Sequence, residues 1–287
     1  MTEITDTSIS AHEEVPPVGR RWGVIPFLGV AIPGRRSYRV WQRNRDVFFQ
    51  LWKAELLPPV FEPVMMFLAL GLGLGTYVEL TGDDEYIQFL GPGVLAMFAM
   101  FAAVFEALWG AYFRLDQHGT YDAILATPAR PEEIVAGEIL WAASRGAINA
   151  TLILLVMIVL TPFYDLVESP LAILALPVAF LTGVVFGSFG QAYVSIARSV
   201  SQLTYFFSLF ILPMFWFSGG FFPLDGLPTW ASTLAWFTPL YHGVELNRGF
   251  ISGDLDSGHL GHFAWLVIVT PPAVWLALRT MRRRIIA

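Results

Sequence analysis

The stretch Leu171–Ala197 reads LAILALPVAFLTGVVFGSFGQAYVSIA and contains no aspartate, glutamate, lysine or arginine. A bilayer core of about 30 Å is crossed by a helix of roughly 20 apolar residues, so this segment is long enough to span a membrane. A helix would also satisfy its backbone polar groups internally, as lipid requires. Similar apolar runs recur from about Leu56 to Leu278, so we expect an integral membrane protein.

Six segments in all are apolar over such a length. The predicted spans are Leu56–Val78, Ile87–Phe113, Ile139–Leu160, Leu171–Ala197, Leu203–Phe222 and Leu260–Leu278. Composition agrees with this prediction, because 55% of the 287 residues are hydrophobic and only 14% are charged. The fold class is therefore all-α integral membrane, with residues 55–287 forming one transmembrane domain.

The basic residues predict the orientation, because lysine and arginine are retained on the cytoplasmic side. With six spans, 16 of the 17 basic residues fall on one side of the membrane, and only Arg248 falls opposite. Five or seven spans would place a basic cluster on the wrong side. We expect a multi-pass protein of the cell inner membrane with both termini cytoplasmic. Because its basic residues are segregated by loop, we expect no nucleic-acid partner.

The N-terminal part is expected to lie in the cytoplasm. Residues 1–36 have no charged start leading into an apolar core, so they are not a signal peptide, and we expect them to be partly disordered. Residues 37–54 are expected to form an amphipathic helix on the membrane surface. Its apolar stripe comprises Val40, Trp41, Val47, Phe48, Leu51 and Trp52.

The longest cytoplasmic loop, Arg114–Gly137, carries helix signals. Thr120 can cap a short helix that Pro128 ends, and Asp122 suits its N-terminal dipole. A second helix is expected to start at Pro131, with two glutamates in its first turn.

These two short helices would project from the membrane. They would present Tyr121, Ile124 and Leu125 as an apolar ridge to a groove on a partner. A loop that only connects two spans is the alternative.

Three segments resemble the ABC-2 type permease family. They are GTYDAILATPARPEEIVAGE at residues 119–138, FSGGFFPLDGLP at 217–228 and TPLYH at 238–242, where Thr238 replaces the family's commoner asparagine. They lie at the positions in the predicted topology where the family has them. Residues 139–146, ILWAASRG, are most similar to permeases that export lipooligosaccharides such as nodulation factors.

The resemblance implies a coupling helix that docks on an ATPase. Its residues here are Gly119, Thr120, Tyr121, Asp122, Ile124, Leu125, Thr127 and Pro128. A phosphate-binding loop needs a lysine after glycine, and the only lysine is Lys53, within LWKA. The ATPase, with its ATP and magnesium, is therefore expected in a separate chain, present in two copies, and the permease is expected to pair with a second copy of itself. We expect no catalytic residue, metal or cofactor in this chain.

The outer end of the fifth span is expected to contain a gate. Pro213 should kink or break that helix, and Gly219, Gly220 and Pro223 follow it. The segment Pro223–Gly258 is expected to form re-entrant or interfacial helices that close the exit. An ordinary aromatic belt would also explain its tryptophans.

Few charges lie inside the predicted spans: Glu62, Glu106, Glu138 and Arg145. A charge in mid-bilayer costs about 2.5–3.5 kcal/mol, so each should face protein or water. We expect Glu138 to form a salt bridge near the cytoplasmic surface. Glu106 lies deeper and is the best candidate for a residue that lines the path, and Glu138 and Arg145 could transmit motion.

Two other classes of function remain open. An ion-coupled secondary transporter would need ionisable relays and usually internal repeats, which the sequence does not show. An intramembrane enzyme would need a site such as His242, His259 and His262, whose spacing is poor for a metal. The cargo is open among a glycan, a lipooligosaccharide and a drug-like amphiphile.

Overall fold

The computed structural model describes residues 30–77 and 86–286. Most of the N-terminal segment predicted for residues 1–36 lies outside the described residues, as does the outer loop at 78–85. The regular elements of the described residues are all helices. They are α1 (Arg36–Gln50), α2 (Trp52–Met66), η1 (Phe67–Leu74), η2 (Gly75–Tyr77), α3 (Tyr86–Phe105), η3 (Glu106–Gly110), η4 (Phe113–Gln117), α4 (Thr120–Leu125), α5 (Pro131–Tyr164), η5 (Pro170–Leu174), α6 (Ala175–Val194), α7 (Val200–Phe206), η6 (Phe207–Ile211), α8 (Leu212–Trp216), η7 (Leu224–Gly226), α9 (Thr229–Trp236), α10 (Pro239–Ser252) and α11 (Ser257–Ile286).

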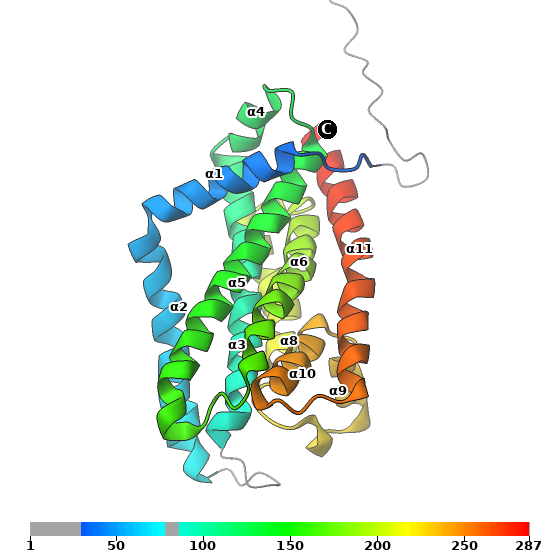
Figure 1. Cartoon of the computed structure of the whole chain (residues 1–287). Coiled ribbons are helices and arrows are strands. Elements are labelled where there is room, and N and C mark those ends of the chain that lie inside the picture. Colours follow the sequence, from blue (N-terminus) through cyan, green and yellow to red (C-terminus); the bar gives the residue numbers. More distant parts are fainter. Residues whose placement is uncertain (1–29, 78–85, 287) are drawn as a thin grey trace, which may run out of the picture.

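Four continuous helical stretches among the described residues are long and apolar enough to cross a membrane, and they stand side by side (Figure 1). They are Tyr86–Gln117, Pro131–Tyr164, Pro170–Val194 and Ser257–Ile286, at the places of the second, third, fourth and sixth predicted spans. The first and fifth predicted spans correspond to shorter apolar helices, Leu57–Gly73 and Val200–Trp216.

Three boundaries differ from the sequence-based prediction. The helix of the third predicted span, α5, begins at Pro131 and not at Ile139, so the expected second cytoplasmic helix is the first part of α5. The fifth apolar helix ends at Trp216, because the backbone of residues 217–222 leaves helical geometry. The surface helix ends at Gln50, and α2 begins at Trp52, three residues before the expected start of the transmembrane domain at residue 55.

Small residues let the central helices α3, α5 and α6 approach closely. A Cβ added at Gly183 would lie 2.8 Å from Ala143 Cα, and one at Gly190 would lie 2.7 Å from Ala107 Cβ. A Cβ added at Gly146 would lie 2.9 Å from the carbonyl oxygen of Ala99. Such close packing stabilises helix bundles in lipid, where the hydrophobic effect does not bring helices together.

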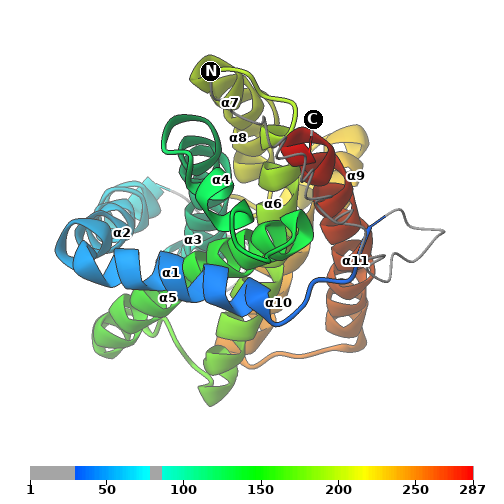
Figure 2. The ribbon, with the colours of Figure 1, turned by 90° about the horizontal axis from the view of Figure 1, so that it is seen from above.

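The two ends of the bundle differ in their elements (Figure 1). One end carries α1, α4 and the C-terminus, and the other carries α9 and α10. α1 lies across the bundle, as the view from above shows (Figure 2). It crosses α5 where a Cβ added at Gly137 would lie 2.5 Å from Val40 Cβ.

Only part of the apolar stripe predicted for the surface helix is buried in the structure. Val40 and Phe48 are buried as expected, with the polar Asn44 between them, but Val47, Leu51 and Trp52 are about half exposed. The helix thus keeps apolar side chains on a face that this chain does not cover. Trp41 joins it to α5 through a hydrogen bond from Nε1 to Ser144 Oγ at 2.9 Å.

We expect Gly93→Ala to destabilise the protein by more than a surface change would. A Cβ at Gly93 would lie 2.5 Å from both Cα and the carbonyl oxygen of Gly220, so backbone would have to move. Overpacking of this kind costs about 1–3 kcal/mol. Thermal unfolding of the detergent-solubilised protein measures the effect. Gly73→Ala is the matched control, because its new Cβ would lie 3.7 Å from its nearest neighbour. An equal loss in both variants would contradict the close contact.

Candidate functional site

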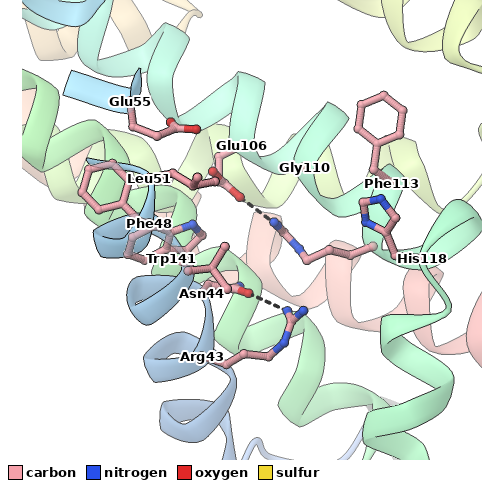
Figure 3. Close-up of a pocket in the computed structure, with 12 residues that line it drawn as sticks. Arg43, Asn44, Phe48, Leu51, Glu55, Glu106, Gly110, Phe113, His118 and Trp141 are labelled. Atoms are coloured by element: carbon pink, nitrogen blue, oxygen red, sulfur yellow. Dashed lines mark hydrogen bonds and ion pairs between the residues drawn. The ribbon is translucent and has the colours of Figure 1, made fainter. Parts of the chain in front are cut away.

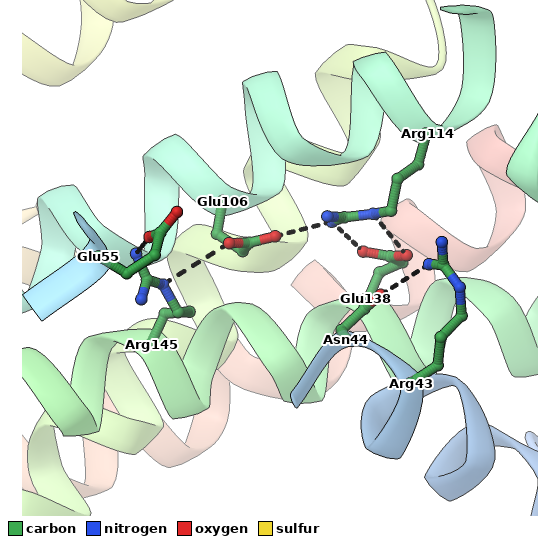
Figure 4. Close-up of polar contacts among 7 residues, drawn as sticks. All are labelled: Arg43, Asn44, Glu55, Glu106, Arg114, Glu138 and Arg145. Carbon is green, nitrogen blue, oxygen red and sulfur yellow. Dashed lines mark hydrogen bonds and ion pairs between the residues drawn. The ribbon is translucent and has the colours of Figure 1, made fainter. Parts of the chain in front are cut away.

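A row of five alternating charges runs through the half of the bundle that carries α1 and α4 (Figure 4). In order it comprises Glu55, Arg145, Glu106, Arg114 and Glu138, which come from α2, α5, η3, η4 and α5. The row joins α2, the stretch Tyr86–Gln117 and α5, and it runs along these helices rather than across them.

Arg114 is the central member of the more buried half of the row, between Glu106 and Glu138. Its Nε lies 3.0 Å from Glu138 Oε1, and its Nη2 lies 2.8 Å from Glu106 Oε1. The Glu138 side chain is only 1% exposed, and those of Arg114 and Glu106 are each 15% exposed. Because the guanidinium is a planar fork, it can serve both carboxylates at once. Glu138 forms the expected salt bridge, with Arg114 as its partner.

Arg145 forms the second half of the row. Its Nη2 lies 2.6 Å from Glu55 Oε2, and its Nε lies 3.6 Å from Glu106 Oε2. The guanidinium carbon is 4.6 Å from the centre of the Phe48 ring of α1. Glu106 therefore stands between two arginines, and the Arg145 side chain also contacts the surface helix.

Two cavities flank Glu106. The first, of about 300 Å³, lies between α1 and the inner end of α3 and is shown in Figure 3. Its wall includes Arg43 and Phe48 of α1, Trp141 of α5 and His118. The second, of about 390 Å³, lies between α2, α3 and α5. Glu106 lines both cavities, and its predicted place beside a transport path stays a prediction.

The short helix α4 rests on this charged row. Tyr121 is 1% exposed, and its hydroxyl lies close enough to Glu138 and Arg114 to interact with both charges. Burial raises the pKa of Tyr121 well above its usual value, so the hydroxyl stays protonated at neutral pH. The prediction that Tyr121 is presented to a partner is therefore wrong, because its side chain points into the protein.

The exposed surface of α4 is not formed by the predicted apolar ridge. Ile124 and Leu125 are half-buried and pack against the hydrophobic core. The exposed residues of this segment are Asp122, Ala123, Ala126, Thr127 and Pro128. Polar and small side chains thus form the surface at this end of the molecule.

The start of α4 depends on Gly119. Its φ is +56°, a left-handed conformation that glycine adopts without strain. Gly119 is the N-cap residue and Thr120 the first helical residue, so the predicted capping by the Thr120 side chain is wrong. The end of α4 is closed by a hydrogen bond from Thr127 Oγ1 to the Ile124 carbonyl oxygen at 2.6 Å.

The turn after α4 joins both neighbouring helices. The guanidinium of Arg36 on α1 donates to the Pro128 carbonyl oxygen. Pro131 opens α5, and the Arg130 backbone N–H donates to Glu133 Oε2 at 3.0 Å, which caps the helix as the proline and acids predict. A groove of about 680 Å³ separates α1 from α4 and has arginines along its α1 side.

Three of the predicted gate residues lie in one loop at the opposite end. Gly219 has a φ of +78°, and Gly220 packs against Gly93 of α3. Pro223 precedes the short η7 turn. Pro213 lies apart from them, within helix α8 after the π-helical turn η6, so the helix continues past this proline and ends at Trp216.

Arg248 holds this loop. Its Nη2 donates to the Gly219 carbonyl oxygen at 3.0 Å, and its guanidinium carbon is 4.4 Å from the centre of the Phe89 ring. Its Nη1 donates to Glu245 Oε1 at 2.5 Å. The Tyr86 hydroxyl donates to the Phe221 carbonyl oxygen at 2.9 Å from the other side.

The histidines at the end of the bundle that carries α10 do not form a metal site in the described residues. Nδ1 of His242 is 2.7 Å from Nδ1 of His262, and Nε2 of His242 is 2.8 Å from the Trp236 carbonyl oxygen. His259 instead pairs with Asp256 at 2.7 Å. Burial, reinforced by His262, lowers the pKa of His242 to about 4, so this ring is neutral at pH 7.

Three residues that matter to these arrangements were not singled out from the sequence. Arg114 looked like an ordinary loop arginine, although it follows Glu106 by eight residues on one helical stretch. Glu55 was regarded only as the first residue of the predicted transmembrane domain. Arg248 carried the clearest signal, because it is the one basic residue predicted outside.

These features define a membrane-spanning transport protein, and the sequence places it in a family. Residues 37–251 match the model of the ABC-2 type transporter family, and the chain belongs to that family. It is therefore a member of a family of membrane-spanning transport permeases.

Individual relatives agree with this assignment. Nodulation protein J of Rhizobium leguminosarum bv. trifolii is 34% identical over 249 residues, which cover 86% of this chain and 93% of that protein. Nodulation protein J of Sinorhizobium fredii is 31% identical over 252 residues, covering 86% and 93%. The Inner membrane transport permease YadH of Escherichia coli is 26% identical over 191 residues, covering 62% and 73%.

Proposed function

We propose that this chain is the membrane subunit of an ABC exporter in the cell inner membrane. It crosses the membrane six times with both termini in the cytoplasm. Two copies form the pathway, and each binds one copy of a separate ATPase that holds ATP and magnesium. The cargo is an amphipathic molecule such as a lipooligosaccharide or another glycan, and it moves outward.

The observation that carries this proposal is the position of α4. It lies at one end of the bundle with a polar surface outward, and its inner side chain Tyr121 is buried in the hydrophobic core beside the charges of Arg114 and Glu138. A force applied to α4 therefore reaches the helices α3 and α5 through buried contacts. A partner that closes on ATP needs such a connection.

The names of the relatives support transport at the inner membrane. One is named as an inner membrane transport permease, and others share the name Nodulation protein J. The absence of a phosphate-binding loop in the sequence is consistent with a separate ATPase. The predicted gate residues Gly219, Gly220 and Pro223 lie at the end opposite to α4, where an outward exit would be, with Pro213 on the helix that leads to them.

Reconstitution tests the function. The chain should co-purify with an ATPase encoded beside it, and liposomes holding both should move a glycolipid only when ATP is hydrolysed. An ATPase variant without its phosphate-binding lysine is the matched control. If the chain alone moves cargo on a proton gradient, the protein is a secondary transporter and the proposal is lost.

Cysteine labelling tests the orientation, and the chain has no native cysteine to interfere. Glu168 is exposed in the turn after α5, and Thr127 is exposed after α4. In intact cells we expect Glu168→Cys to react with a membrane-impermeant maleimide and Thr127→Cys to react only after the cells are opened. The opposite order of labelling would invert the topology and remove α4 from the cytoplasm.

A further inference from the structure

The second cavity beside Glu106, which we call the acidic cleft, has a distinctive wall. It is lined from α2 by Glu55, Pro58, Pro59 and Glu62, from α3 and η3 by Phe98, Phe101, Ala102, Phe105, Glu106 and Gly110, and from α5 by Arg145 and Asn149. From Phe98 to Gly110 the helical rise is about 18 Å, so the cleft extends from the charged row toward mid-bilayer.

The polar groups of the cleft offer acceptors and hardly any free donor. Its lining contains three carboxylates but only one basic side chain, Arg145. That guanidinium already faces Glu55 at 2.6 Å and Glu106 at 3.6 Å. Glu62 makes no ion pair with any described residue, so it contributes an uncompensated negative charge.

Asn149 supplies an independent sign that a ligand belongs here. The residue is 6% exposed, and its Oδ1 is buried without a hydrogen-bond partner among the described residues. A buried amide oxygen left without a donor costs about 1–3 kcal/mol, so such atoms are rare unless something else satisfies them. A donor on a bound molecule would do so.

The apolar wall completes the site. Phe98, Phe101 and Phe105 follow one another at helical spacing, with ring centres 6.1 and 6.2 Å apart. Such a row suits an acyl chain, and its ring faces attract cations and the C–H faces of sugars. Polar acceptors and aromatic rings thus lie side by side in one cavity of about 390 Å³.

We infer that the acidic cleft binds the cargo before export, and that the cargo is an amphiphile whose head group donates hydrogen bonds and carries no net negative charge. Hydroxyl or amine groups satisfy Asn149 and Glu62, while the adjoining apolar part lies on the phenylalanine row. A phosphate head group would lie beside carboxylates that carry the same negative charge and donate no hydrogen bond to it. This inference rests on the proposed export function and adds the charge of the head group.

Binding measurements on the full-length chain in phosphatidylcholine nanodiscs test it. The probes are three amphiphiles with the same dodecyl chain and the same fluorophore but with a glucoside, an amine or a phosphate head. Empty nanodiscs report simple partitioning. We expect saturable binding of the glucoside and the amine, at least about tenfold tighter than that of the phosphate, because the phosphate would lie close to carboxylates of the same charge.

Variants connect that binding to the cleft. Asn149→Leu should weaken glucoside and amine binding by roughly five- to tenfold, the effect of one lost hydrogen bond. Glu62→Gln should reduce the preference for the amine over the phosphate. Thr151→Val is the matched control on α5, because the Thr151 hydroxyl bonds only to the Ala147 carbonyl oxygen of its own helix.

Phe105→Ala is a further variant should Asn149→Leu fold poorly, because Phe105 is 47% exposed. Its ring contacts Phe101, Trp109 and Phe207, so thermal unfolding of this variant is measured beside its binding. The variant should weaken binding of all probes. Equal or tighter binding of the phosphate probe, or unchanged binding in the cleft variants, overturns the inference. Probe binding needs neither ATP nor the ATPase, so that outcome leaves export itself standing, and a missing ATPase partner leaves the binding result standing.

Discussion

Ala126→Arg is expected to reduce ATP-driven transport by more than about tenfold while leaving the fold intact. Ala126 is exposed in the turn that ends α4, beside Thr127 and on the same outer side as Asp122. If an ATPase covers this surface, a long charged side chain prevents close docking. If α4 is only a connecting segment, the same side chain extends into water and changes nothing.

The measurement compares ATPase stimulation and transport in the reconstituted complex with thermal unfolding of the permease alone. An exposed substitution shifts stability by no more than about 0.5 kcal/mol, so a loss of activity at constant stability reports docking. Ala126→Ser is the control, because it keeps the small size. Leu125 is less informative, because it packs against the core and its substitution mixes docking with folding. If the Ala126→Arg permease stimulated the ATPase fully, that result would contradict a docking role for α4.

Arg114→Met is expected to destabilise the protein by about 3–5 kcal/mol, the cost of leaving a buried carboxylate without its partner. Glu138 would bear most of this cost, because its side chain is 1% exposed and its charged oxygens contact Arg114. Glu106 would still have Arg145 at 3.6 Å. The loss is to be measured by thermal and denaturant unfolding in detergent.

A second substitution separates the charge from the packing. Arg114→Met combined with Glu138→Gln removes both partners and should recover most of the lost stability, since replacing a buried ion pair by neutral groups is often nearly neutral. Arg283→Met, at an exposed position near the C-terminus, should have little effect. Similar losses in the single and the double variant would show that the Arg114 side chain acts through packing and not through its charge.

The long apolar helices could be predicted from the sequence, because lipid demands continuous apolar runs and leaves few alternatives. The start of α5 at Pro131 was equally visible as a proline followed by acids, although its continuity with the span was not. The end of the fifth helix was misplaced, because residues 217–222 are apolar in composition while their backbone is bent around Gly219.

The side-chain arrangement was harder to predict. Tyr121 was expected outside as part of an apolar ridge with Ile124 and Leu125 on a short projecting helix, yet a tyrosine near a buried ion pair can pack inward and keep its proton. The pairing of Arg114 with both Glu106 and Glu138 depends on how α5 packs against the end of α3. Sequence separation along one chain carries no information about that packing.

The row of charges has an odd number of members, and its two ends differ. At one end Glu138 is sealed in the protein, whereas at the other end the Glu55 side chain is 39% exposed. If α2 swung outward about the break at Leu51, Glu55 would pass into water and Arg145 would keep Glu106. The bundle can therefore open along α2 without leaving a buried charge that has neither water nor an ion-pair partner. The same movement would widen the acidic cleft on its α2 side.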